Sequence, residues 1–182
     1  MGSVVVKMEE KMPKRKEIRL KNYDYSEPGA YFITICTKSK ERLLWKGKPE
    51  AQKYDWKLVG AHCVRPLGLP LSKAGIIVED NLNRLNNTYE NVYLSSYVIM
   101  PNHIHLIIVI LPSEDGRTQC APTVSKMIKL FKESVTKQLG ESIWQKLFYD
   151  HIIRDQRDYE KISKYIFDNP MKWEEDELFY GE

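Results

Sequence analysis

The chain of 182 residues is expected to adopt an α+β fold of the ferredoxin-like βαββαβ type, an antiparallel sheet with one additional C-terminal helix that carries Tyr165. Segments rich in β-branched and aromatic residues alternate with segments whose apolar residues recur every three or four positions. Their order along the chain is strand, helix, strand, strand, helix, strand and helix. Two of the strands are separated only by Pro101 and Asn102, which predicts an antiparallel hairpin.

The four expected strands share this β-branched and aromatic composition. They cover residues 30–38, 93–100, 103–111 and 147–154. The first of them follows a turn that contains Pro28 and Gly29.

Three helices are expected, each with a signal for its start or its end. The first runs from the N-cap residue Ser72 to about Thr88, and the second starts at Thr123 or Ser125 and ends at Gly140. The third covers residues 156–168 and is stopped by Pro170. In the first two helices, apolar residues at helical spacing should face the core; these are Val78, Leu82, Leu85 and Tyr89, and Val124, Ile128, Phe131 and Val135.

Two parts of the chain lack such patterns. Residues 1–16 are interpreted as a mobile basic arm, and residues 17–182 as a single domain. Residues 39–71 are interpreted as a long connection, with a small hairpin within it as the alternative.

Composition favours a cytoplasmic protein. The three cysteines, Cys36, Cys63 and Cys120, are widely spaced and form no CxxC motif, which fits a reducing compartment. The apolar run at residues 104–111 is too short to cross a bilayer, and the N-terminus lacks the apolar segment of a signal peptide. We therefore expect no membrane partner.

Basic residues gather in two places although the net charge is only +3. Local clusters of this kind can bind phosphates even when the net charge is small. The candidate DNA contacts are Lys14, Arg15, Lys16 and Arg19 in the N-terminal segment and Lys126, Lys129 and Lys132 in the second helix. The alternative is that these side chains are simply solvated.

The segment MPNHIHLIIVI, residues 100–110, is the most informative part of the sequence. His103 and His105 are two residues apart on an expected strand, so both side chains point to the same face of the sheet. Two imidazoles on one face can hold one metal ion as surface ligands at a strand end. The alternative is a pair of half-buried histidines with ordinary hydrogen bonds.

The last expected helix offers further candidates in YIFDNP, residues 165–170. Tyr165 and Asn169 are four residues apart, which places them on one helix face. The Asn169 carbonyl oxygen is a competent ligand for a hard cation, with Tyr165 beside the metal. Taken singly, Tyr165 could equally be a core aromatic residue and Asn169 a helix C-cap.

Taken together, these motifs resemble the single-tyrosine HUH transposases, and most closely the REP-associated tyrosine transposases. Further stretches agree with the resemblance, namely residues 18–37, 97–110 and 148–173. The family pattern consists of two histidines separated by one hydrophobic residue, a catalytic tyrosine, and a polar residue four positions later. The tyrosines Tyr149 and Tyr159 fit less well, because neither is followed four residues later by Asn or Gln.

The resemblance implies that Tyr165 attacks the DNA backbone to give a 5′-phosphotyrosine, while His103, His105 and Asn169 bind Mg²⁺ or Mn²⁺. The ligand types suit Mn²⁺ better than Mg²⁺. The implied substrate is single-stranded or hairpin DNA, with palindromic repeats as targets, and the protein would be a monomer or a homodimer. The sequence identifies no base for the tyrosine proton; Lys161, one turn earlier, is a candidate.

Two other functions remain open from the sequence. The first is a protein of the same fold that binds hairpin DNA without cutting it. The second is a zinc protein that uses His103 and His105 with Cys63 or His62.

Overall fold

A computed structural model describes residues 27–48, 55–59, 63–112 and 123–179 of the chain. The expected basic arm, and with it Lys14, Arg15, Lys16 and Arg19, lies outside the described residues. Within the described segments, none of the helices combines the length and apolar character that a membrane span requires.

One six-stranded sheet forms the centre of the fold, with the strand order β2-β3-β4-β5-β1-β6. The four strands β4, β5, β1 and β6 pair antiparallel, in the order of a ferredoxin-like βαββαβ unit. The strands are β1 (Gly29–Cys36), β2 (Asp55–Val59), β3 (Cys63–Leu67), β4 (Val92–Ile99), β5 (His103–Ile110) and β6 (Tyr149–Ile153).

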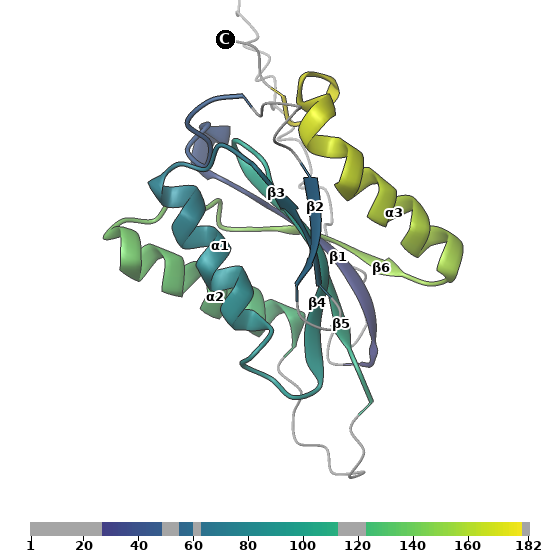
Figure 1. The fold of residues 1–182 in the computed structure, drawn as a ribbon. Helices are drawn as coiled ribbons and strands as arrows, with labels where there is room; N and C mark the ends of the chain where they lie inside the picture. The colour runs from purple at the N-terminus through teal and green to yellow at the C-terminus, as the bar shows by residue number, and fades with distance from the viewer. Residues whose placement is uncertain (1–26, 49–54, 60–62, 113–122, 180–182) are drawn as a thin grey trace, which may run out of the picture.

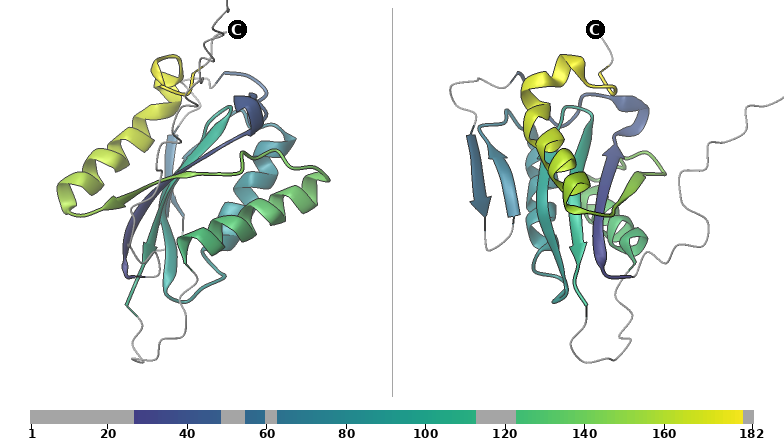
Figure 2. Two further views of the ribbon diagram at one scale, coloured as in Figure 1. Left: turned by 180° about the vertical axis from the view of Figure 1, so that it is seen from behind. Right: turned by 90° about the vertical axis from the view of Figure 1, so that its right-hand side faces the viewer.

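Helices lie on both faces of this sheet (Figures 1 and 2). Helix α1 (Lys73–Leu85) and helix α2 (Val124–Leu139) lie side by side on one face, and helix α3 (Gln156–Asp168) lies on the other. Two short 3-10 segments complete the described elements, η1 (Lys38–Lys40) and η3 (Asn169–Glu175). The expected fold class, with its additional C-terminal helix, is therefore confirmed.

The predicted helix ends are confirmed or corrected by their hydrogen bonds. Ser72 and Thr123 are the N-caps of α1 and α2, and Gly140 ends α2 in the left-handed conformation at φ 82°. Helix α1 ends at Leu85 and not at Thr88 as predicted. The Asn86 side chain accepts a hydrogen bond from the backbone of Leu94, which draws the chain away from the helix axis toward β4.

The interpretation of residues 39–71 as a long connection was wrong for its second half. Residues 55–59 and 63–67 form the alternative hairpin, and β3 of that hairpin pairs parallel with β4 at Val64 and Ser96. These strands were hard to recognise because Pro66 and the basic residues Lys57 and Arg65 interrupt their apolar pattern. The sheet therefore has six strands, where four were expected.

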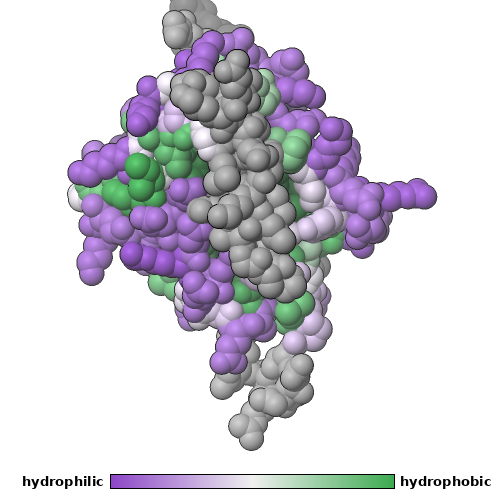
Figure 3. Space-filling view, viewed as in Figure 1, coloured by the Kyte–Doolittle hydropathy of each residue, from purple (hydrophilic) through white to green (hydrophobic). Residues whose placement is uncertain are grey.

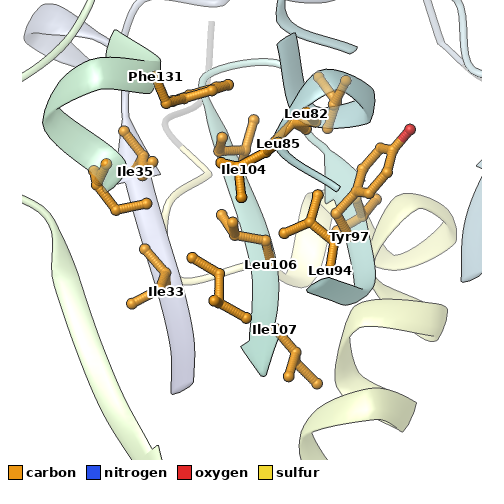
Figure 4. Close-up of a cluster of buried hydrophobic side chains, with 14 of the residues drawn as sticks. Ile33, Ile35, Leu82, Leu85, Leu94, Tyr97, Ile104, Leu106, Ile107 and Phe131 are labelled. Atoms are coloured by element: carbon orange, nitrogen blue, oxygen red, sulfur yellow. The ribbon is translucent and has the colours of Figure 1, made fainter. Parts of the chain in front are cut away.

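The main hydrophobic core lies between the sheet and the helices α1 and α2. Figure 4 shows Ile104 and Leu106 of β5 beside Ile33 and Ile35 of β1, together with Leu82, Leu85 and Phe131 from the two helices. Because side chains alternate along a strand, the neighbours of these residues point to the opposite face. Those neighbours include Phe32, Thr34, His103 and His105, which lie on the side of α3.

Helix α3 covers that second face with a narrow apolar stripe. Ile162 and Ile166 are its buried residues, and the helix contacts β4 and β5. Tyr159 extends this contact through a hydrogen bond to Ser95 of β4. The position of α3 brings the following turn of the helix, with Tyr165, over the start of β5.

A close approach between α1 and the loop after η1 yields a stability prediction. Gly75 packs so tightly that an added Cβ would lie 2.2 Å from the carbonyl oxygen of Leu44, whereas an added Cβ at Gly47 would meet nothing within 4 Å. Gly75→Ala should therefore lower the free energy of unfolding by about 2 kcal/mol or more, because backbone must move. Gly47→Ala should leave it within about 0.5 kcal/mol. Urea denaturation of both variants measures the difference, and equal stabilities would contradict the packing described here.

Candidate active site

The two histidines of the HIH motif begin β5 and face α3. Cys36 of β1 pairs with His103, and Thr34 pairs with His105. The exposed fractions of His103 and His105 are only 0% and 3%. The expectation that they are surface ligands was wrong, because α3 and the segment after it cover this end of the sheet.

Hydrogen bonds fix the orientation of both imidazole rings. The Asn102 amide donates to the carbonyl oxygens of Leu178 (2.9 Å) and Lys40 (3.3 Å), so its own oxygen accepts from Nδ1 of His103 (2.7 Å). A neutral His103 then carries its lone pair on Nε2. That Nε2 atom lies 2.9 Å from Nε2 of His105, whose Nδ1 is 2.8 Å from the Thr34 hydroxyl.

Burial keeps these rings in the form that can bind a cation. Desolvation lowers the pKa of His103 to about 3, and it lowers the pKa of His105 well below its usual value, with His103 contributing further. Both imidazoles are therefore neutral near pH 7. With Nδ1 of His103 committed as a donor, its Nε2 presents a lone pair toward His105, where a divalent cation can accept it.

Tyr165 reaches the histidine pair from α3. Its hydroxyl lies 3.2 Å from Nε2 of His105, and the rings of Tyr165 and His105 meet edge-on with centroids 5.1 Å apart. Phe32 of β1 contacts both rings. Tyr165 is nevertheless 42% exposed, so its hydroxyl group is close to the buried pair and the residue remains accessible from outside.

Asp176 is a member of the site that the sequence did not single out. Its Oδ2 atom accepts hydrogen bonds from the Tyr165 hydroxyl (3.1 Å) and from the Asn169 amide (2.9 Å), and it lies 4.0 Å from Nε2 of His103. The residue belongs to a run of four acidic residues, 174–177, in which nothing marks one position. The segment η3 folds back after Pro170 and thereby carries Asp176 to the histidines.

Asn169 lies where the spacing from Tyr165 predicted, at the end of α3. It is the C-cap residue of that helix, and its side chain is buried with only 4% of the residue exposed. Among the described residues, no hydrogen-bond partner exists for its Oδ1 atom. A buried carbonyl oxygen without a partner is costly, and a cation at the site would satisfy it.

These donors fit a divalent metal ion. Within the described residues, His103, His105 and Asp176 each offer one ligand atom, and these atoms lie within 4.8 Å of one another. Two neutral imidazoles combined with carboxylate and amide oxygens suit ions such as Mn²⁺. The third group in this cluster is a carboxylate and not a cysteine: Cys63 belongs to β3, which β4 separates from β5, and His62 lies outside the described residues.

The ionisation of Tyr165 is opposed in this arrangement. Burial, and then the neighbouring Asp176 carboxylate, raise the pKa of the Tyr165 hydroxyl well above its usual value. The phenol is therefore protonated at neutral pH, and its proton already points to a carboxylate. Lys161, the base considered from the sequence, is exposed on α3, whereas Asp176 makes the contact.

The other predicted site residues lie elsewhere. Lys126, Lys129 and Lys132 are on α2, which covers the opposite face of the sheet. Lys132 donates to the carbonyl oxygens of Gln145 (2.9 Å) and Leu147 (3.2 Å), and Lys129 pairs with Glu133. The structure thus brings Tyr165, Asn169 and the two histidines together, and it does not bring these lysines to them.

Comparisons with known proteins identify relatives of this chain, and one of them is a transposase. An uncharacterized protein of Haemophilus influenzae is 32% identical over 184 residues, which cover 91% of this chain and 93% of that protein. The REP-associated tyrosine transposase of Escherichia coli is 30% identical over 80 residues, which cover 43% of this chain and 44% of that protein. No family model matches the chain.

A solved structure shares the fold. It is the structure of a REP-associated tyrosine transposase bound to a REP hairpin, with a TM-score of 0.56, 20% sequence identity, and coverage of 85% of this chain and 73% of that one. Fold and relatives together define a transposase. The chain is similar to the REP-associated tyrosine transposases in sequence and shares their fold.

The network around Asn102 gives a prediction for the site. Asn102→Ala should lower the free energy of unfolding by about 2 kcal/mol, because it removes the acceptor of His103 and leaves two carbonyl oxygens with one donor fewer. Hydrogen exchange at Leu178 should also become faster. Asn91→Ala is the matched control, since its amide makes one long bond of 3.4 Å at the surface. Equal effects of the two substitutions would show that Asn102 does not organise the site.

Proposed function

We propose that the protein is a metal-dependent single-stranded DNA endonuclease and strand transferase in which Tyr165 is the nucleophile and a 5′-phosphotyrosine is the intermediate. The observation that carries the proposal is the position of the Tyr165 hydroxyl, 3.2 Å from Nε2 of His105, which itself lies 2.9 Å from Nε2 of His103. Residues 17–182 would form one catalytic domain, and residues 1–16 would form a basic arm.

His103 and His105 would hold the metal ion, together with Asn169 through its orphaned Oδ1 atom and Asp176 through its carboxylate. When bound, Mg²⁺ or Mn²⁺ would act as a Lewis acid that polarises the scissile phosphate. The chain's own contribution is to keep the imidazoles neutral by burial and to orient them through Asn102 and Thr34.

In the transfer step, a bond forms between the Tyr165 oxygen and phosphorus while the bond from phosphorus to the 3′-oxygen breaks. Asp176 accepts the phenol proton, because its carboxylate already accepts the Tyr165 hydrogen bond. The acidity of the phenol increases as its oxygen bonds to phosphorus, which overcomes the raised pKa of the resting hydroxyl. The departing 3′-oxygen gains one proton and becomes a hydroxyl, so the step consumes no further reactant.

Reversal of this step by a different 3′-hydroxyl would join two strands. One phosphodiester is exchanged for another, and the energy of the broken bond is kept in the phosphotyrosine. This chemistry matches the transposase family of the chain.

The proposed substrate is single-stranded or hairpin DNA, with palindromic repeats as targets. A structural relative of the same fold is bound to a REP hairpin. The exposed residues Lys126 and Lys129 would contact phosphates beyond the site, since they lie on the opposite face of the sheet from Tyr165.

The central prediction concerns Tyr165. Tyr165→Phe should abolish metal-dependent cleavage of hairpin DNA with a single-stranded flank, and with it the covalent adduct on a denaturing gel. Binding of the same DNA should persist, because the phosphate contacts remain. The loss of one oxygen from a half-exposed side chain should change the stability by less than about 1 kcal/mol.

Tyr149→Phe is the matched control, because Tyr149 is also exposed and lies on β6. It should cut at the rate of the parent protein. Mass spectrometry of the digested adduct locates the nucleotide. Attachment to Tyr149 or Tyr159 would overturn the assignment of the nucleophile.

A second prediction separates the metal ligands from the nucleophile. His105→Ala, Asn169→Ala and Asp176→Asn should each weaken Mn²⁺ binding by roughly ten-fold or more in titration calorimetry, because each removes a ligand or its charge. Asp168→Asn is the control: Asp168 is the residue before Asn169, but its carboxylate pairs with Lys164 and Lys172. Tyr165→Phe should bind Mn²⁺ like the parent. If Asp176→Asn also binds like the parent, Asp176 is not a ligand.

A further inference from the structure

Beside the candidate active site lies a second feature, a cleft of about 400 Å³ between the loop after η1 and the C-terminal segment. Its lining includes Trp45, Trp173, Phe179, Arg42, Lys48 and Glu174. A volume of this size is within the range of small-molecule sites. On the face shown in Figure 3, hydrophilic side chains predominate, and hydrophobic side chains gather in separate patches among them.

The aromatic walls of the cleft are held rigidly. The Trp45 indole donates to the carbonyl oxygen of Ile99 (2.7 Å), which fixes its ring at the end of β4. Trp173 and Phe179 meet edge to face, with centroids 5.2 Å apart and an interplanar angle of 78°. Both tryptophans are largely buried, at 8% and 7% exposure, so their rings need no reordering to receive a ligand.

Charged groups of both signs stand at the rim of the cleft. The Arg42 guanidinium lies over Phe179 (5.0 Å to the centroid) and over Trp173 (5.9 Å). Lys48 and Glu174 pair with each other at the surface. Aromatic faces with an arginine plane are the surfaces on which unpaired bases stack, and rim donors and acceptors can meet the edge of a base.

The cleft shares a wall with the histidine site. The Trp173 ring lies 6.0 Å from the His103 ring, centroid to centroid. Backbone hydrogen bonds join Asp176 to Trp173 (3.2 Å) and Phe179 to Asp176 (2.8 Å). One short segment therefore supplies two walls of the cleft and the carboxylate that contacts Tyr165.

From this we infer that the cleft binds a base of the single-stranded DNA, that of a nucleotide next to the scissile phosphate. The inference rests on the proposed function, because it places the cut DNA at the histidines. Stacking of the base on the Arg42 guanidinium, which lies over Phe179 and Trp173, would position the backbone for attack by Tyr165. Trp45, Arg42 and Phe179 would then be positioning residues for the DNA and not catalytic ones.

The test compares two single-stranded decamers with identical phosphates, one of random base sequence and one fully abasic. Their affinities are measured by fluorescence anisotropy without metal, on the uncleaving Tyr165→Phe protein. The decamer with bases should bind more tightly than the abasic decamer. Arg42→Ala/Phe179→Ala should reduce this affinity ratio roughly ten-fold, because the base loses its stacking surface in the cleft. The affinity of the double variant for the abasic decamer should fall much less, because only the positive charge of Arg42 is lost for that ligand.

The matched control is Arg84→Ala/Leu130→Ala. These residues also combine one arginine with one apolar side chain, and they line a hollow of about 220 Å³ between α1 and α2. The control should keep the full advantage of bases over the abasic decamer. The inference is overturned if both double variants lose the advantage of bases equally. It is also overturned if the Tyr165→Phe protein without further substitutions binds the two decamers equally well.

A photocrosslink provides the second measurement. A decamer that contains 5-iodouracil should attach to Trp45, Trp173 or Phe179, located by mass spectrometry. Attachment exclusively to aromatic residues outside the cleft would contradict the inference. A different outcome would contradict the proposed function alone. In that case the unsubstituted protein would bind bases in the cleft but would form no phosphotyrosine in the presence of metal.

Discussion

The alternation of side chains along β5 is the constraint on which the rest of the structure depends. Ile104 and Leu106 enter the core beneath α1 and α2, so His103 and His105 must point to the other face. A strand register shifted by one residue would bury both imidazoles among aliphatic side chains and remove the pair from Tyr165. Eight paired positions with β1 fix this register, and hence the site depends on the same pairing as the core.

Burying two imidazoles is costly unless their nitrogen atoms have partners, and the structure supplies these from three directions. Thr34 comes from the neighbouring strand, Asn102 from the turn that precedes β5, and Tyr165 from α3. The same burial lowers the pKa of both rings, so both imidazoles are neutral near pH 7. The same groups that orient the rings also hold the layers together, so the geometry of the site and the stability of the fold depend on the same contacts.

The segment after Pro170 gives the site its negative charge. Its turn returns Asp176 to the histidines, to the Tyr165 hydroxyl and to the Asn169 amide, and Leu178 binds Asn102. The Asp176 carboxylate opposes ionisation of Tyr165 and also offers an acceptor for its proton. In the proposed reaction, this phenol with a raised pKa and a nearby proton acceptor would react only when a phosphate is in place.

The sequence by itself determined the order of elements, the helix caps, the shared face of His103 and His105, and the one-turn spacing of Tyr165 and Asn169, because these follow from local periodicity and capping chemistry. It left the β2–β3 hairpin only as an alternative, because Pro66, Lys57 and Arg65 interrupt the apolar pattern of its strands. Nor did it reveal Asp176, because its position depends on a turn that returns the carboxylate to His103, a residue far from it along the chain. The burial of the histidine pair likewise belonged to the tertiary structure: a strand places two side chains on one face, but only the packing of α3 decides whether water reaches that face.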